Sequence, residues 1–129
     1  MANVVLKGYK VTEYDFANKH DGAKEIKLTH KVNYNVKYSK TNICVGRIEA
    51  TSYDKDNPQI FGVRIVIEGT FTYNTDIEKE KIHVESFKEL YPIAKAIVTT
   101  NTASAGIPPI ILPPYDIENH GIIRYDKND

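Results

Sequence analysis

The residues best suited to chemistry in this chain are a His-x-Glu pair, His83 and Glu85, and a cysteine, Cys44. Zinc deaminases use a His-x-Glu pair together with a Pro-Cys-x-x-Cys motif that follows it in the chain. Here Cys44 precedes the pair, and the chain has no second cysteine. The spacing therefore predicts no metal site and no catalytic site at these residues.

The other titratable side chains also lack a catalytic pattern. Glutamates and lysines alternate near the His-x-Glu pair, which is typical of a solvated face, whereas paired carboxylates for acid–base catalysis require burial. Cys44 falls in a strand pattern, so we expect a small buried hydrophobe. No phosphate-binding glycine loop, dinucleotide fingerprint or Gly-x-Ser-x-Gly motif is present, so we expect no enzyme and no cofactor. The alternating charges are Glu78, Lys79, Glu80, Lys81, Glu85, Lys88 and Glu89.

An apolar segment near the C-terminus is more informative. Residues 107–114 read Ile-Pro-Pro-Ile-Ile-Leu-Pro-Pro. Proline fixes φ and lacks a backbone donor, so this segment can neither extend a helix nor fill a central strand. It must lie across another surface, which becomes a candidate binding groove. The segment can cover the protein's own core, contact a client or a neighbouring subunit, or do both.

Four segments show the period-two alternation of half-buried antiparallel strands. The clearest is residues 25–39, where His30 interrupts an apolar face and is expected to be a satisfied core or interface histidine. Residues 59–75 repeat the pattern, and Gly69 indicates a bulge or a close backbone approach. Residues 42–52 and 4–17 each change parity, and Gly46 would permit a bulge in the first. The turn-like links predict an antiparallel meander or Greek key.

One principal helix is expected between the last strand and the apolar segment. After a mixed-charge linker at residues 76–81, residues 83–88 predict a helical turn. Pro92 belongs near a helix start, where its missing N–H costs nothing, and the helix should end at Gly106. One such helix cannot shield four long strands, so we expect an uncovered apolar sheet face, capped by self-association or a bound chain. The predicted fold is α+β: a four-stranded antiparallel sheet, one principal C-terminal helix and a Pro-rich crossover loop.

Composition bounds the class of molecule. The 129 residues fit one domain, 1–129, and 41% hydrophobic with 26% charged residues is typical of a globular chain. Lysine plus arginine and aspartate plus glutamate both number 17, which gives no argument for nucleic acid or an anionic membrane as a partner. No segment approaches the roughly 18 apolar residues of a membrane helix, and the first apolar run is too short for a signal peptide. We therefore expect a cytoplasmic protein without membrane insertion.

The order of four antiparallel strands, a helix and a proline-bracketed loop resembles the SecB family of export chaperones. The resemblance is carried by residues 9–16 of the first strand, by Leu90-Tyr91-Pro92 and Ala94-Lys95 in the helix, and by Pro108, Leu112 and Pro114 in the loop. It implies an oligomer, a dimer or a tetramer, that holds unfolded or precursor polypeptides in apolar grooves. The residues implied to contact these polypeptides are Tyr34, Val36 and Tyr38 of the sheet and Ile107, Ile110, Ile111, Leu112 and Tyr115 of the loop.

Two features depart from the export members of that family. Residues 116–129 stand where export members carry a longer second helix and a tail that contacts the translocase motor SecA. Those members also present an acidic sheet face to the motor, whereas the exposed face of residues 27–39 carries Lys27, Lys31 and Lys37 and no carboxylate. Both departures argue against SecA as a partner. Three roles remain open: holding export-bound precursors, protecting an antitoxin or another dedicated partner, and a structural oligomerisation module without client binding.

Overall fold

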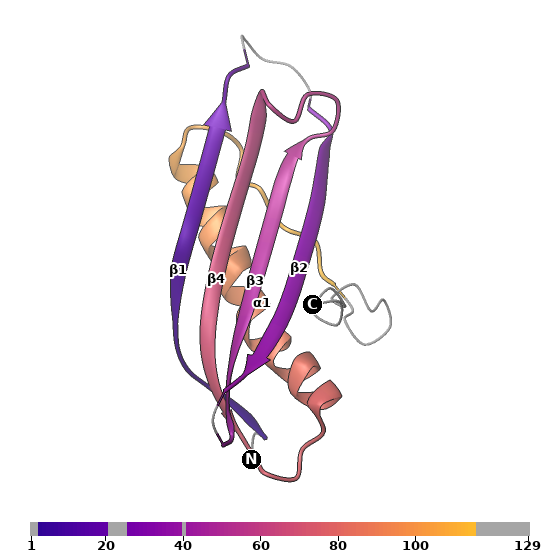
Figure 1. The fold of residues 1–129 in the computed structure, drawn as a ribbon. Coiled ribbons are helices and arrows are strands. Elements are labelled where there is room, and N and C mark those ends of the chain that lie inside the picture. Colours follow the sequence, from indigo (N-terminus) through magenta and orange to yellow (C-terminus); the bar gives the residue numbers. More distant parts are fainter. Residues whose placement is uncertain (1–2, 21–25, 40, 116–129) are drawn as a thin grey trace.

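A computed structural model describes residues 3–20, 26–39 and 41–115. In chain order it contains β1 (Val4–Asn18), β2 (Leu28–Tyr38), β3 (Ile43–Asp54), β4 (Phe61–Tyr73) and α1 (Lys79–Ser104). The strands form one antiparallel sheet in the order β1-β4-β3-β2, and α1 crosses one face of it obliquely (Figure 1). The α+β prediction is confirmed. Because β1 lies beside β4 rather than beside β2, the sheet is a Greek key, not a meander.

The core lies between the sheet and α1. Strand β3 shows why, because its residues alternate strictly: Cys44, Ile48 and Ala50 are buried, and their neighbours are partly or fully exposed. The parity change expected near Gly46 is therefore wrong. Gly46 stays in register with β4, and it makes room for the Tyr34 ring, since a Cβ at position 46 would lie 2.1 Å from the Tyr34 hydroxyl.

Strand β1 carries the irregularities in the pairing of the described strands. Its register against β4 shifts between Leu6 and Gly8 and again between Val11 and Glu13. The second shift produces the parity change expected in this segment. Gly69 on β4 is not at a register shift. Instead, an ideal Cβ there would lie 2.8 Å from the Leu90 side chain of α1, so Gly69 serves the close approach of helix and sheet.

Helix α1 is longer than the sequence predicted. It begins at Lys79, inside the segment expected to be a linker, and runs for 26 residues with Pro92 in its interior. The prediction that Pro92 begins a helix is wrong. An interior proline removes a backbone hydrogen bond and crowds the preceding turn. Leu90, Tyr91 and Ala94, on both sides of it, are buried in the core, and this packing outweighs the local cost.

Within the part of the chain that the structure describes, no helix has the length and hydropathy needed to span a membrane.

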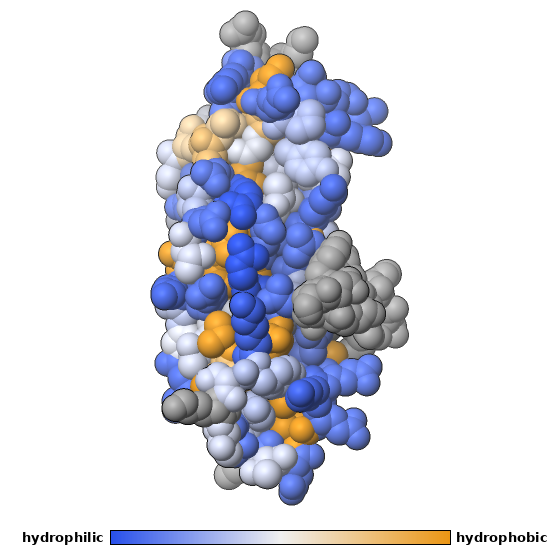
Figure 2. Space-filling model, in the orientation of Figure 1, coloured by the Kyte–Doolittle hydropathy of each residue, from blue (hydrophilic) through white to orange (hydrophobic). Residues whose placement is uncertain are grey.

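The face of the sheet away from α1, here called the outer face, is polar. Figure 2 shows this side as mostly hydrophilic, with small separate hydrophobic patches. Arg64 of β4 lies 2.6 Å from the Glu49 carboxylate and also pairs with Glu13 and Asp15 of β1. The prediction of an uncovered apolar sheet face is therefore wrong, because charged pairs occupy much of that face.

The large apolar side chains that stay exposed lie mainly elsewhere. Three of them, Tyr9, Val11 and Phe16, lie on the edge strand β1. They pair with residues of β4 that lie on the face of the sheet toward α1, namely Gly69, Ile67 and Val63. Ile111 is exposed on the loop after α1. The other exposed large apolar residues among those described are Val5 and Ile43.

Candidate functional site

The segment after α1, residues 106–115, is here called the strap. The helix ends at Ser104 with Ala105 as its C-cap, and Gly106 has a φ of 84°, the left-handed conformation that favours glycine after a helix. From Ile107 onward the strap has no helix or strand, as predicted from its four prolines. It crosses on the helix side of the sheet toward the β2 edge (Figure 1).

Side chains of α1 hold the strap in place of regular backbone pairing. The Thr99 hydroxyl donates to the Ile110 carbonyl at 2.9 Å, and the Ile110 N–H donates to the Thr102 hydroxyl at 2.9 Å. The Tyr91 hydroxyl donates to the Pro113 carbonyl. Burial raises the pKa of Tyr91, which keeps the phenol protonated and able to donate. The polar backbone of the strap is thus partly satisfied by the helix.

The anchored strap alternates between the core and the surface. Ile110 is 5% exposed and Leu112 is 1% exposed, whereas Ile111 between them is 71% exposed. This is the alternation of an extended chain. The strap therefore covers the core with Ile110 and Leu112 and, at the same time, presents Ile111 at the surface.

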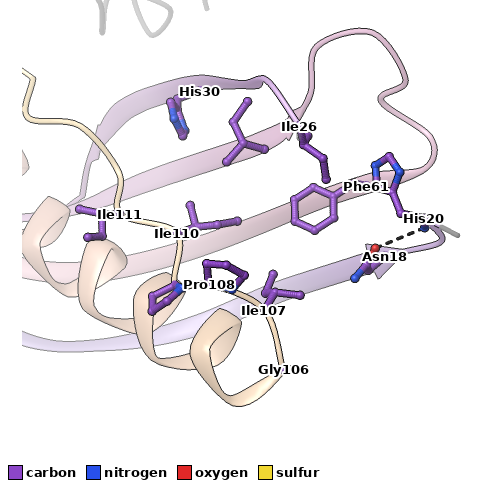
Figure 3. Close-up of a pocket in the computed structure, with 12 residues that line it drawn as sticks. Asn18, His20, Ile26, His30, Phe61, Gly106, Ile107, Pro108, Ile110 and Ile111 are labelled. Carbon is purple, nitrogen blue, oxygen red and sulfur yellow. Dashed lines mark hydrogen bonds between the residues drawn. The ribbon is translucent and has the colours of Figure 1, made fainter. Parts of the chain in front are cut away.

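A cleft of about 660 Å³ lies between the strap and the adjoining ends of the sheet. Figure 3 shows Ile26, Phe61, Ile107 and Ile110 pointing toward one another across it, with His30 and His20 toward its two ends. The walls are therefore apolar and the ends polar. The residues that line this strap cleft are Asn18, His20, Ile26, Leu28, His30, Phe61, Gly106, Ile107, Pro108, Pro109, Ile110 and Ile111.

The two histidines that line the cleft are each backed by a buried polar group of β3. His30 Nδ1 lies 2.6 Å from the Ser52 hydroxyl oxygen, and His20 Nε2 lies 3.2 Å from the Asp54 carboxylate. Burial lowers the pKa of His30, which favours the neutral ring at pH 7. His30 is thus a partly buried, hydrogen-bonded histidine at the rim of the core, close to the role predicted for it.

The polar groups near the cleft do not support catalysis. Ser52 and His30 are a nucleophile–base pair in type, but Ser52 is fully buried and its hydroxyl cannot reach a substrate. No three His, Cys, Asp or Glu residues within the described ranges are grouped so that they could hold a metal ion. Apolar walls with hydrogen-bonding ends are suited to binding an extended apolar peptide segment.

The eight residues predicted to contact polypeptide do not lie together. Ile107, Ile110 and Ile111 line the strap cleft. Leu112 is part of the core, and Tyr115 packs edge-on against the Tyr91 ring with centroids 5.5 Å apart. The strap thus contributes three of its five predicted residues to the cleft.

The three predicted residues of β2 lie further along the strand than the cleft. Tyr34 is fully buried, and its hydroxyl donates to the Ser86 hydroxyl at 2.6 Å. Val36 and Tyr38 are partly buried, and the Tyr38 ring meets Tyr73 and the Lys79 ammonium group. In the single chain, Tyr34 has no surface to offer a ligand.

Sequence reasoning missed several cleft residues. Leu28 and His30 share the face of β2 that carries Tyr34, and Ile26, just before β2, has the same parity. Asn18, His20 and Phe61 reach the cleft because β1 ends and β4 begins at this end of the sheet. The parity of β2 could have indicated the first group. The position of the second group depends on the order of the strands in the sheet, which the alternation pattern of each strand does not determine.

Cys44 and His83, whose side-chain types are suited to chemistry, are structural residues. Cys44 is fully buried, and burial raises the pKa of its thiol to about 11, so it is a poor nucleophile at neutral pH. The His83 ring packs edge-on against Tyr34, with centroids 5.2 Å apart. Both residues therefore belong to the core between sheet and helix.

Comparison with known proteins adds two likenesses. No protein-family model matches the chain. The sequence is 29% identical over 89 residues to the protein-export protein SecB of Paramagnetospirillum magneticum, covering 58% of this chain and 56% of that protein, so the chain spans about half the length of the curated relative it matches. The structure resembles the Mycobacterium tuberculosis SecB-like chaperone Rv1957, solved in complex with a ChAD peptide from the antitoxin HigA1. The TM-score is 0.67 at 13% identity, with 88% of each chain covered, and this likeness shows the fold.

Proposed function

Because the chain is SecB-like in sequence and in fold, we propose that it is a non-enzymatic chaperone that holds unfolded polypeptide segments in the strap cleft. The observation that carries the proposal is Ile111, which is 71% exposed on a strap whose neighbouring residues line an apolar cleft. Each client side chain that becomes fully buried would supply roughly 1.5–3 kcal/mol before ordering costs. Several such contacts give broad rather than sequence-specific binding.

The proposed contact residues follow from their positions. Ile107, Ile110 and Ile111 form the strap wall, and Leu28 and Phe61 form the sheet wall. We propose that Val36, Tyr38 and Tyr115 extend the site along β2, while Tyr34 and Leu112 support it from the core. Strand β2 is an edge of the sheet, so its free side can pair with extended client backbone.

Two client classes are compatible with this site. The Mycobacterium tuberculosis neighbour was solved with a peptide from an antitoxin, which favours a dedicated partner. The similarity to a protein-export protein favours export precursors instead. On the outer face, Lys31 and Lys37 are exposed and Glu13, Asp15 and Glu49 share the Arg64 guanidinium. The outer face thus carries charges of both signs instead of a uniformly acidic surface, which argues against SecA as a partner, so we favour the dedicated polypeptide.

The proposal includes a cytoplasmic homo-oligomer. Tyr9, Val11 and Phe16 leave apolar area exposed along the β1 edge, and a second copy is the occupant that would cover it in a dimer or a tetramer. Sedimentation velocity measures this directly. A species at the mass of a single chain at micromolar concentration would contradict it.

The test of client holding uses an unfolding protein. A reduced, aggregation-prone client is mixed with the protein, and light scattering follows its aggregation over time. We expect suppression at stoichiometric ratios if the cleft is open to clients. Undiminished aggregation would favour the alternative of a structural oligomerisation module.

A matched pair of substitutions locates the holding surface. Ile111→Asp places a charge where the strap is exposed, and we expect it to abolish most of the suppression because an unpaired carboxylate is costly to bury under an apolar client. Val5→Asp makes the same change at an exposed β1 position that pairs with Thr72. We expect Val5→Asp to hold clients normally. Equal loss in both folded variants would remove the strap from the site.

A further inference from the structure

The two threonines that anchor the strap form a matched pair around one residue. Thr99 donates to the carbonyl of Ile110, and Thr102 accepts from the N–H of the same residue. Both backbone groups of Ile110 are thereby satisfied by hydroxyls one turn apart on α1. The Thr102 hydroxyl is fully buried and also donates to the Val98 carbonyl at 2.7 Å, so its own orientation is fixed.

Thr99 and Thr102 favour one register of the strap over the registers shifted by one residue. In an extended chain, moving the anchor by one residue exchanges the inward and outward side chains. Here the anchor on Ile110 puts Ile110 and Leu112 inward and leaves Ile111 outward. Burying both Ile110 and Leu112 favours this arrangement over one that buries Ile111 alone. The hydrogen bonds that Thr99 and Thr102 make with Ile110 add to this preference, as does the hydrogen bond from the Tyr91 hydroxyl to the Pro113 carbonyl.

We propose that Thr99 and Thr102 are positioning residues that set the strap register and thereby choose Ile111 as the side chain presented to a client. The inference rests on the proposed client-holding function for its binding consequence. Its structural consequence, the exposure of position 111, is independent of any client. Prolines at 108, 109, 113 and 114 stiffen the strap on both sides, so a slip moves the segment as a unit.

The structural consequence is measured by cysteine labelling. Ile111→Cys introduces an exposed thiol, while the native Cys44 is buried with its pKa raised to about 11 and competes poorly. In this background Thr102→Val removes the acceptor while keeping the side-chain shape. We expect labelling at position 111 to slow, because the loss of one buried hydrogen bond raises the ratio of slipped to native register by about tenfold, and position 111 points inward in the slipped register. Unchanged labelling in a folded protein would overturn the proposal.

The binding consequence is measured with a fluorescent apolar peptide. Thr102→Val should weaken peptide binding in proportion to the fraction of molecules that leave the native register, and Thr102→Ser, which keeps the hydroxyl, should restore it. Thr100→Val is the matched control, because Thr100 lies between the two threonines on α1 but is exposed. If Thr102→Val does not fold, Thr99→Val at a partly exposed position carries the test, with a smaller loss expected.

Two failures are distinguishable. If the wild-type protein binds no peptide, client holding fails, while the labelling rates still report on the register. If wild-type binding is normal and neither Thr102→Val nor Thr99→Val changes affinity or labelling, the threonines do not set the register.

Discussion

The helix face and the outer face of the same sheet differ in how they are stabilised and in what they leave exposed. The helix face buries a continuous apolar core that includes Ile48, Ile65 and Leu90. The outer face carries charges, and Arg64 there contacts three carboxylates. Most of the exposed apolar area therefore lies at the margins of the helix face, along the β1 edge and on the strap, and the bare face of the sheet keeps only smaller patches such as Val5 and Ile43.

This difference indicates where a ligand can bind. A helix that crosses the sheet obliquely covers its centre and leaves corners, and one corner is closed by the strap (Figure 1). The strap cleft lies at that corner, between α1's C-terminal end and the ends of β1, β2 and β4. A client held there would continue the apolar core, whereas the outer face would meet a partner through charge.

The largest expected effect comes from the helix face. Leu90 is fully buried beside Gly69, so Leu90→Ala should lower the free energy of unfolding by about 2–5 kcal/mol. Denaturant unfolding followed by circular dichroism measures this loss. Val45→Ala, at a partly exposed outer-face position of β3, is the control and should cost much less. Similar losses at both positions would mean that the two faces do not differ as described.

A smaller effect is expected from the outer face. Arg64→Gln removes the cation shared by Glu13, Asp15 and Glu49 and should cost about 1 kcal/mol or less. The difference from wild type should shrink in about 1 M salt, because exposed charges are screened. Burial raises the pKa of Glu49, but the hydrogen bond and the charge of Arg64 lower it by more, so the pKa lies below its ordinary value. The variant should therefore raise the pKa of Glu49. A salt-independent loss would point to packing rather than charge.

The smallest expected effect is a pH dependence of the unfolding free energy, caused by His30 in the cleft. Burial lowers the pKa of His30 from its ordinary 6.5, so the folded protein disfavours the charged ring more than the unfolded chain does. The stability that comes from the neutral ring is present above pH 6.5 and is lost as the pH falls through the lowered folded pKa. Unfolding free energies at pH 8 and pH 5.5 should differ more in the wild type than in His30→Gln. An equal pH difference in both would exclude His30 as the cause.

The sequence was sufficient for much of the fold. Period-two alternation located the four strands, and the prolines identified the strap as extended. It failed where packing overrides local preference. Pro92 looked like a helix start, yet it lies inside α1 because buried residues flank it on both sides. Gly46 looked like a bulge, yet it makes room for Tyr34 on a regular strand.

The candidate site was predicted only in part for a related reason. Ile107, Ile110 and Ile111 could be recognised from their chemistry and their neighbouring prolines. Which of them points outward depends on the hydrogen bonds that Ile110 makes with Thr99 and Thr102, and the strap sequence alone does not indicate these bonds. Phe61 and His20 reach the cleft through the Greek-key strand order. Tyr34 has the right chemistry and the right parity, but α1 covers it.

The central claim is that clients bind at the strap and not on the outer face. An environment-sensitive fluorophore attached through Ile111→Cys or, separately, through Thr70→Cys on the outer face of β4 tests it, because the buried Cys44 thiol reacts poorly. On addition of an unfolded client, we expect a blue-shifted, brighter emission from position 111 and no change from position 70. A response from position 70 with none from position 111 would contradict it.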